Sequence, residues 1–239
     1  MNIEIASEVF ARVHPKLNIV FLHVRKADNS AKSEEAGDLL EDVEEALRLI
    51  FHKETIKNHM FIAPWSVAQQ EFGKDAKHYQ TSVEHLLKDV LQGKNMITKN
   101  TLTNLVRFIS LKYIVPLAVD DCAAITGNIQ FAVTSGKKKT GVLSTLKSGE
   151  VYYHDDQNIL GAKLDFWKNS KTLPTSETTE ALIHLEILPP ITKDIQKEIV
   201  SELKSLVEDF CNAKVKVFVL NQKKRKIHLA NRFNLLNVG

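Results

Sequence analysis

The residues best suited to chemistry lie together in one short segment, Gly149–Asp156, which reads GEVYYHDD. This segment places the carboxylates of Glu150, Asp155 and Asp156 within a few residues of the His154 imidazole. A carboxylate near an imidazole can act as a general base, because burial and neighbouring charges can poise both groups near neutral pH. Gly, Asp and His are also common at the exposed end of a β-hairpin. A general-base site and a hairpin end are therefore both open interpretations.

A second segment combines an aromatic side chain with amines, as RNA-binding sites do. Trp167 stands among Lys163, Lys168 and Lys171 in the sequence KLDFWKNSKT. Aromatic rings stack on bases while amines contact phosphates, so this spacing can bind RNA. The alternative is that Trp167 is simply a core residue.

The motifs of several large enzyme classes are absent from the sequence. There is no GxxxxGK[ST], GxGxxG, GxSxG or HExxH, which excludes the chemistries that those motifs serve. Cys122 and Cys211 lie far apart with no CxxC pair, an arrangement that argues against a disulfide framework and a zinc cluster. The histidines are scattered, although His78 and His85 could share a face if one helix held both. We therefore expect no metal and no organic cofactor.

The elements that must position these residues follow from hydrophobic spacing. Residues 17–24 (LNIVFLHV) form a short apolar run rich in β-branched side chains, which predicts a buried strand. Apolar residues recurring every three or four positions predict four helices. The first, over residues 34–51, is an acidic surface helix, and the others span residues 83–91, 106–113 and 195–210.

Local signals predict where these elements end. Ser82 can cap the second helix, Gly93 should terminate it, and Pro116 should end the third because proline lacks an N–H group. Residues 127–153 alternate β-prone pieces with SG and TG turns and predict hairpins, while residues 215–219 predict a strand of period two. Helices and strands mix without a regular βαβ rhythm, which favours an α+β sandwich.

The composition is that of an ordinary globular protein. The chain has 239 residues, of which 44% are hydrophobic and 26% charged, so collagen-like, low-complexity and disordered classes are excluded. A chain of this length can bury roughly 70–75% of its unfolded surface, and it needs no metal or disulfide to fold. No run approaches about 18 apolar residues, and the N-terminus lacks the features of a signal peptide. We therefore expect a cytoplasmic protein that does not span a membrane.

The net charge of +3 conceals an uneven distribution of acids and bases. Residues 34–45 hold seven acids and no base, whereas residues 214–239 hold seven bases and no acid, not counting histidine. Further basic runs stand at 137–139 and 223–226. This separation indicates a face prepared for a polyanion such as nucleic acid. An ordinary solvated surface explains it equally well.

Four stretches of sequence, taken with their order and spacing, resemble the freestanding B3/B4 domain proteins, which are relatives of the editing module of the phenylalanyl-tRNA synthetase beta chain. They lie between Pro64 and Leu188 and read HYQTSVEHLLKDVLQGKN, LVRFISLKYIVPLAVDD, SGEVYYHDD and FWKNSKTLPTSETTEAL. The resemblance implies an α+β fold with a β-sandwich core of mixed and antiparallel sheets and flanking helices.

The resemblance also implies how the chain is divided. We expect one domain over residues 1–239. Its family core would occupy residues 64–190, preceded by a strand–helix elaboration at 1–63. A C-terminal helix and strand with a basic tail would follow at 191–239.

In function, the resemblance implies a protein that acts on tRNA. In the synthetase this module hydrolyses the ester of tRNA that carries the wrong amino acid, and a freestanding version is suited to released aminoacyl-tRNA. We expect binding of the aminoacyl end of tRNA, with hydrolysis in trans as a further option, and no DNA or membrane partner. Such editing needs an amino-acid pocket, a positioned water and donors for the carbonyl oxygen, but no metal or organic cofactor.

The expected site residues are carried over position by position from this resemblance. Glu150 is expected to orient the water, with Lys112 and Lys168 receiving a phosphate or the carbonyl oxygen. The other substrate-binding candidates are Arg107, Ser110, Tyr113, Asp121, Tyr152, Asp155, Trp167, Thr172 and Thr178. Each has a structural alternative: Asp121 could be a helix cap, for example, and Thr178 could cap a helix over the run TEALIHL.

The sequence departs from the family pattern at several positions. Arg107 stands where the family carries asparagine, Ala118 where the synthetase carries histidine, and Asp89 and Lys168 where arginine is common. Lysine keeps the charge of arginine but loses its bidentate fork, so RNA recognition would be weaker or different. Two alternatives to an editing enzyme stay open: a non-catalytic RNA-binding module, and a protein that binds a free amino acid or related metabolite.

Overall fold

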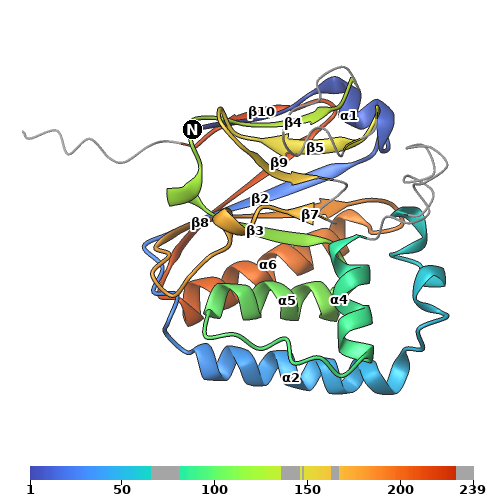
Figure 1. Cartoon of the computed structure of the whole chain (residues 1–239), viewed down its shortest axis with the longest axis vertical. Helices are drawn as coiled ribbons and strands as arrows, with labels where there is room; N and C mark the ends of the chain where they lie inside the picture. The colour runs from blue at the N-terminus through green and yellow to red at the C-terminus, as the bar shows by residue number, and fades with distance from the viewer. Residues whose placement is uncertain (66–80, 136–145, 147, 163–166, 230–239) are drawn as a thin grey trace, which may run out of the picture.

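The computed structural model describes residues 1–65, 81–135, 146, 148–162 and 167–229. Within these ranges the chain forms three layers: a six-stranded sheet, a four-stranded sheet facing it, and helices on the outer face of the second sheet (Figure 1). The predicted α+β fold, with a β-sandwich core and flanking helices, is confirmed.

Some sequence features lie outside the described residues. These are His78, Lys163, the basic run at 137–139 and the end of the basic tail at 230–239. No helix in the described part of the chain is both long enough and apolar enough to cross a lipid bilayer.

The six-stranded sheet joins the start of the chain to its middle and its end. In spatial order its strands are β10 (Lys226–His228), β1 (Asn2–Ile5), β4 (Ile129–Val133), β5 (Val151–His154), β6 (Ile159–Ala162) and β7 (Trp167–Lys168). β1 runs parallel to β4, and the other neighbouring strands are antiparallel. The antiparallel pair β4–β5 confirms a hairpin within residues 127–153.

The four-stranded sheet is antiparallel throughout. In spatial order its strands are β3 (Leu117–Asp121), β8 (Glu180–Ile187), β2 (Asn18–Arg25) and β9 (Lys214–Asn221). β2 and β9 confirm the strands predicted at 17–24 and 215–219. The interpretation of Thr178 as a helix cap is wrong, because the run TEALIHL belongs largely to β8. From residue 181 to 187 this strand is buried on both faces, so it lacks the alternation that marks a half-exposed strand.

Helices cover the outer face of the four-stranded sheet. The longer ones are α2 (Ser33–Ile50), α4 (Ser82–Leu91), α5 (Thr101–Tyr113) and α6 (Lys193–Phe210), and they confirm the four predicted helices. A short helix, α1 (Ser7–Arg12), follows β1. Single 3₁₀ turns stand at η1 (Ile56–Asn58), η3 (Cys122–Ala124) and η5 (Ser170–Thr172).

Local hydrogen bonds set the starts of the two helices nearest the cavity described below. Thr81, not Ser82, caps α4, and its hydroxyl accepts a hydrogen bond from a backbone N–H of the first turn at 3.3 Å. α5 begins before the predicted residue 106 because the Asn100 side chain accepts a hydrogen bond from the Thr103 N–H at 2.9 Å. The apolar stripe of α5 also begins earlier than predicted, with the buried residues Leu102 and Leu105.

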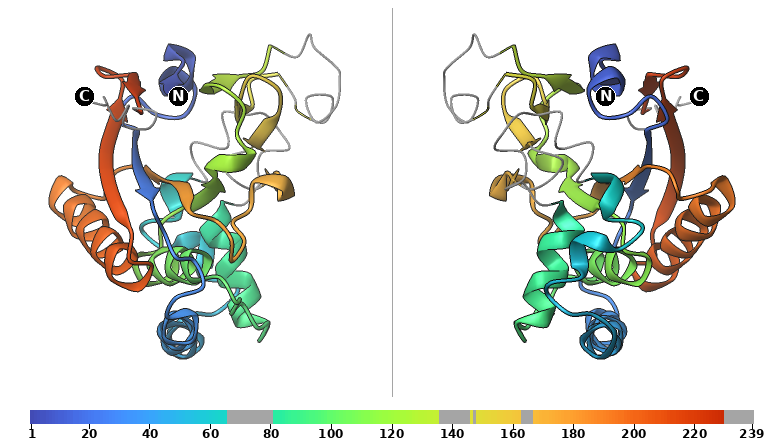
Figure 2. Two further views of the ribbon diagram at one scale, coloured as in Figure 1. Left: turned by 90° about the vertical axis from the view of Figure 1, so that its left-hand side faces the viewer. Right: turned by 90° about the vertical axis from the view of Figure 1, so that its right-hand side faces the viewer.

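Apolar clusters between the layers hold the fold together. Phe21 and Phe131 belong to the cluster between the two sheets, and their rings meet edge to face at 5.8 Å. Leu105 and Leu203 belong to the cluster between the four-stranded sheet and the helices α5 and α6. Leu87 belongs to a third cluster among α2, α4 and α5. Seen from the side, α6 and β9 lie on one flank of the molecule and α4 on the other (Figure 2).

Candidate functional site

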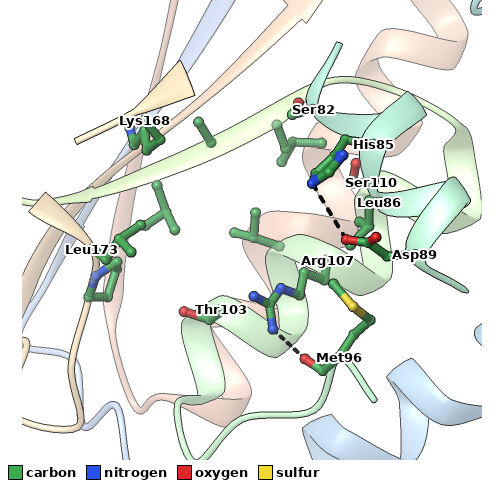
Figure 3. Close-up of a pocket in the computed structure, with 15 residues that line it drawn as sticks. Ser82, His85, Leu86, Asp89, Met96, Thr103, Arg107, Ser110, Lys168 and Leu173 are labelled. Carbon is green, nitrogen blue, oxygen red and sulfur yellow. Dashed lines mark hydrogen bonds and ion pairs between the residues drawn. The ribbon is translucent and has the colours of Figure 1, made fainter. Parts of the chain in front are cut away.

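A cavity of about 380 Å³ opens between α4, α5, the edge strand β3 and β7 (Figure 3). Its volume falls in the range of about 300–1,000 Å³ that is typical of small-molecule sites. β3 and β7 are each the last strand of a sheet, so the cavity lies where neither sheet continues. Apolar side chains make much of its wall, namely Leu86, Met96, Val106, Leu117, Val119 and Leu173.

Two cationic side chains reach the cavity from different elements. Arg107 extends from α5, and its guanidinium donates a hydrogen bond to the Met96 carbonyl oxygen. Burial lowers the pKa of Arg107, while the carboxylates of Glu44 and Asp89 oppose that effect. Lys168 comes from β7, on the side of the cavity away from α4 (Figure 3). A ligand inside would therefore meet a positive charge from two sides.

The α4 wall is polar because residues three and four positions apart share a helix face. Ser82, His85 and Asp89 all line the cavity from this face. His85 Nε2 lies 3.5 Å from Asp89 Oδ2, and Lys94 donates to the other oxygen of Asp89 at 2.5 Å. The hydroxyl oxygen of Ser82 is buried and has no hydrogen-bond partner among the described residues. This wall therefore offers an imidazole beside a carboxylate.

Lys168 is anchored from behind by the fully buried carboxylate of Asp120. The Lys168 ammonium lies 2.6 Å from Asp120 Oδ2, which also accepts a hydrogen bond from the Tyr153 hydroxyl at 3.1 Å. The Thr172 hydroxyl donates to the other oxygen of Asp120 at 2.5 Å. Charge-assisted bonds of this kind are stronger than neutral ones. They fix the ammonium of Lys168 at the cavity wall.

The hydrogen bonds continue from Tyr153 into the space between the sheets. The Tyr153 hydroxyl also contacts Lys168, and it lies 3.2 Å from Nε2 of His184. Nδ1 of His184 lies 2.6 Å from a carboxylate oxygen of Glu186. All of these groups except Lys168 are almost completely buried. A chain of polar groups thus runs from the cavity to Glu186, inside an otherwise apolar core.

A comparison with known families places this site within one of them. The family described as the B3/4 domain matches residues 64–212. The chain belongs to the B3/4 domain family. The resemblance seen in the sequence is thereby confirmed, and the match reaches beyond residue 190 to include α6. No curated protein matches this B3/4 chain.

Three of the predicted site residues line the cavity of this B3/4 domain: Arg107, Ser110 and Lys168. The Ser110 hydroxyl is committed to the end of α5, because it donates to the Val115 carbonyl oxygen at 2.7 Å. A fourth, Thr172, lies behind the cavity wall on Asp120. The structure therefore brings together part of the predicted set.

Two of the predicted residues lie on the outside of α5, against α6. The Lys112 ammonium pairs with the Glu202 carboxylate at 2.6 Å, and the Tyr113 hydroxyl donates to Glu202 and to Glu198. Burial, together with these acids, raises the pKa of Tyr113. Neither Lys112 nor Tyr113 lines the cavity.

The predicted residues of the segment 149–156 also lie away from the cavity. Glu150 is buried beside β4, where its backbone carbonyl accepts a hydrogen bond from the Thr134 N–H. Asp155 shapes the β5–β6 turn, because its carboxylate accepts from backbone N–H groups at 2.5 and 2.8 Å. The Tyr152 ring stacks on His154. Asp155 therefore has the place at a hairpin end that was one of the two interpretations of this segment, although its side chain is buried.

The remaining predicted residues do not line the cavity either. Asp121 caps η3 through the Ala123 N–H at 2.8 Å and accepts a hydrogen bond from the Thr178 hydroxyl at 2.6 Å. Trp167 is half-buried, so it is not a core residue. It does not line the cavity either.

Two of the residues that the sequence interpretation missed are neighbours of residues that it chose. Asp120 and Tyr153 stand next to Asp121 and Tyr152. Adjacent residues of a strand point to opposite faces, and the sequence shows this alternation without showing which face meets the other sheet. The pair His85 and Asp89 had a visible signal, since the i, i+4 spacing on a helix brings two side chains together.

Proposed function

We propose that this B3/4 domain protein binds the aminoacyl end of tRNA in the cavity beside β3. The observation that carries the proposal is the combination of an apolar wall with two cations, Arg107 and Lys168, in a cavity sized for a small molecule. An apolar amino-acid side chain suits the wall, and the cations suit a terminal phosphate or the ester carbonyl oxygen. The cavity lies within the family match at 64–212. A cytoplasmic location, predicted from the sequence, is part of this proposal.

We further propose that the same cavity hydrolyses the ester. Ala118 offers no imidazole from β3, but His85 offers one from α4, beside Asp89. In the proposed reaction His85 takes a proton from water, and the water oxygen attacks the ester carbonyl carbon. Lys168 stabilises the negative charge on the carbonyl oxygen. The bond to the ribose oxygen then breaks, and that oxygen receives the proton from His85.

This proposal assigns no role to Glu150 or Lys112, because neither lines the cavity. Their predicted catalytic roles stay predictions, and a Glu150→Gln variant tests the first of them. On the present proposal this variant deacylates tRNA at the rate of the wild type, provided that it folds. Circular dichroism and the unfolding midpoint check the folding of the variant.

The deciding experiment for hydrolysis is a panel of mischarged tRNAs, scored by release of labelled amino acid. The wild type should release at least one amino acid, and His85→Ala should lower that rate by about 100-fold, the usual contribution of a general base. His154→Ala is the matched control, because His154 lies on β5 and does not line the cavity. Equal rates for His85→Ala and the wild type would contradict the role of His85.

A non-catalytic RNA-binding module is the second candidate, and one observation favours it. Position 118 on β3 holds an alanine where the synthetase's editing module carries a histidine, so this strand offers the cavity no imidazole. This candidate predicts salt-sensitive tRNA binding without release of amino acid from any tRNA in the panel. A site for a free amino acid predicts instead that the amino acid raises Tm with no RNA present.

A further inference from the structure

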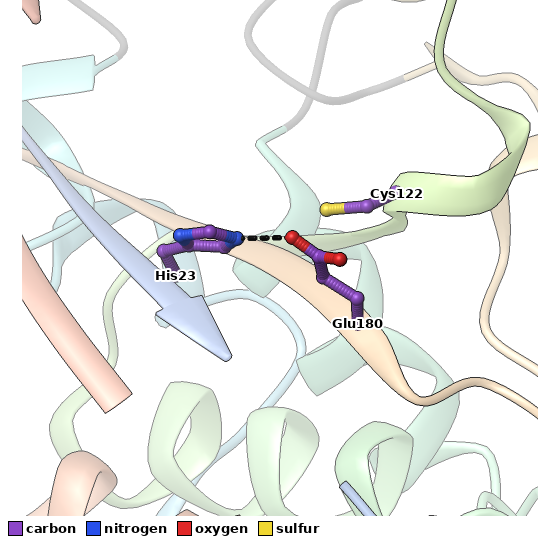
Figure 4. Close-up of side chains that lie close together, drawn as sticks. All are labelled: His23, Cys122 and Glu180. Carbon is purple, nitrogen blue, oxygen red and sulfur yellow. Dashed lines mark hydrogen bonds and ion pairs between the residues drawn. The ribbon is translucent and has the colours of Figure 1, made fainter. Parts of the chain in front are cut away.

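Three side chains with metal-binding atoms meet at the end of the four-stranded sheet, outside the proposed tRNA cavity. They are His23 on β2, Cys122 on η3 and Glu180 on β8 (Figure 4). One ligand atom from each lies within 4.8 Å of the other two, and His23 Nε2 is 2.6 Å from Glu180 Oε1. Among the described residues, this is the group of histidine, cysteine and acidic side chains whose geometry suits a metal ion.

The strand register explains why these residues meet. β2 and β8 are neighbours with Arg25 opposite Glu180, so His23, two residues away, projects from the same face as Glu180. β3 lies on the other side of β8, with Asp121 opposite Ala181. Cys122 is the residue that follows β3, so its thiol arrives at the same end of the sheet. The convergence is built into three adjacent strands.

The set of donor atoms is one that zinc prefers. Zn²⁺ binds imidazole nitrogen, thiolate sulfur and carboxylate oxygen, and three protein ligands with one open position are typical of reactive zinc sites. At zinc–ligand distances of about 2.0–2.3 Å, neighbouring tetrahedral ligand atoms stand about 3.3–3.5 Å apart. His23 Nε2 and Glu180 Oε1, now at 2.6 Å, would need to separate by only about 0.7 Å to admit the ion.

Burial and access also fit such a site. The His23 side chain is 5% exposed, whereas that of Glu180 is 49% exposed. Cys122 and Glu180 line a separate cavity of about 590 Å³, which also contains Asp121 and Glu177. An ion held by the three side chains would therefore face this cavity, from which water could fill the fourth position.

The charges around the thiol suit a cation. Burial raises the pKa of Cys122, and the carboxylates of Glu180, Asp120 and Asp121 raise it further. A divalent ion would be stabilised by the same carboxylates.

We propose that His23, Cys122 and Glu180 form a binding site for Zn²⁺ or a similar divalent transition metal, with water as the fourth ligand. This site is separate from the tRNA cavity and does not depend on the proposed function. The alternative is that the group is only a His23–Glu180 hydrogen bond with a thiol nearby.

Titration of the metal-stripped full-length protein with Co²⁺ and Zn²⁺ separates these possibilities. We expect one ion per chain, a thiolate-to-cobalt charge-transfer band in the absorption spectrum, and a higher Tm in Zn²⁺. Cys122→Ser should lose the charge-transfer band and at least tenfold in affinity. Cys211→Ala is the control, because it removes a thiol that lies on the other side of the sheet, in the cluster with α6.

His23 is buried, so His23→Gln is checked for folding by circular dichroism before titration. If it folds, it should bind Zn²⁺ at least tenfold more weakly than the wild type. A wild-type protein that binds no stoichiometric metal would overturn the proposal. So would a charge-transfer band that persists in Cys122→Ser.

Discussion

Lys168 comes from a strand of only two residues, yet its ammonium is held in place by groups from two other strands. Asp120 on β3 and Tyr153 on β5 both contact it. Such anchoring matters for binding, because a flexible lysine loses side-chain entropy when it is fixed on a ligand. Because Asp120 already holds the Lys168 ammonium, part of this side-chain entropy is lost on folding and not on ligand binding.

A substitution of Asp120 tests this anchor. Asp120→Asn removes the negative partner of a Lys168 side chain that is only 17% exposed. Breaking a buried ion pair from one side costs about 3–5 kcal/mol, so we expect a loss of about 3 kcal/mol in the free energy of unfolding. Urea denaturation measures it. Thr172→Val, which removes one hydrogen bond to Asp120, should cost only about 1 kcal/mol. Equal losses for the two variants would show that the charge of Asp120 is not what matters.

At the scale of single residues, the sequence predicted three residues of the cavity wall and missed the polar wall formed by α4. Lys168, Arg107 and Ser110 were predicted and line the cavity. Asp120 was passed over for Asp121, and Tyr153 for Tyr152. The choice between neighbours depends on which face of a strand meets the second sheet, and that contact is made by residues far away in the sequence.

Among the elements that form the cavity, α5 has a cap that is tied to two distant loops. The Asn100 side chain accepts a hydrogen bond from the Asn29 side chain at 2.9 Å and donates one to the Pro174 carbonyl oxygen at 2.6 Å. It also caps the helix. Pro174 lines the cavity, so this one residue joins the start of α5 to the cavity wall.

Substitutions of two helix caps should therefore lower the free energy of unfolding by different amounts. Asn100→Ala removes three hydrogen bonds, with Asn29, Thr103 and Pro174, each worth about 1 kcal/mol, so we expect a loss of about 3 kcal/mol in unfolding free energy. Thr192→Ala at the exposed start of α6 removes one bond to the Ile195 N–H and should cost about 1 kcal/mol. Thermal and urea unfolding measure both. A cost for Asn100→Ala no larger than that for Thr192→Ala would contradict the proposed link.

The pairing of β5 with β6 makes a different prediction. Gly161 stands opposite Tyr153, and a Cβ at this position would overlap the Tyr153 ring. Gly161→Ala must displace that ring and with it the hydroxyl that contacts Lys168, so we expect a loss of about 1–3 kcal/mol. Urea unfolding measures this loss. An unfolding free energy equal to that of the wild type would show that the ring can move without cost.

Helices were predictable from the sequence because their apolar stripes repeat over many residues. α2 and α6 each have one buried face, and their predicted and observed ends nearly agree. β8 was open to a wrong interpretation as a helix, because both of its faces are buried and the period of two disappears. Its place between β2 and β3 depends on contacts across the whole chain.

In the molecule as a whole, the N-terminal segment is part of the core. β2 lies between β8 and β9, and β1 lies between β10 and β4. This pairing supports our proposal that residues 1–239 form one domain, although the family match begins at residue 64. The acidic helix α2 and the strand β10 of the basic tail lie at opposite ends of the molecule (Figure 1).

The position of β2 predicts that the family-matched segment cannot fold alone. A fragment of residues 64–212 lacks β2. The edge of β8 that pairs with β2 in the full chain would therefore have no partner strand. We expect it to show no cooperative thermal transition, because the four-stranded sheet would lose its central pairing. Calorimetry of the fragment beside the full chain tests this expectation. A cooperative transition in the fragment would show that residues 64–212 form an independent domain that folds without the N-terminal strands.

If the cavity recognises the amino acid joined to the end of tRNA, as we propose, charged and uncharged tRNA must differ in affinity. The ligands are tRNA carrying an apolar amino acid through a non-hydrolysable amide and the same tRNA without an amino acid. The wild type should bind the charged form at least about tenfold more tightly, a difference of about 1.4 kcal/mol, and Arg107→Ala should lower affinity for it. Equal affinity of the wild type for the two tRNAs would contradict the claim.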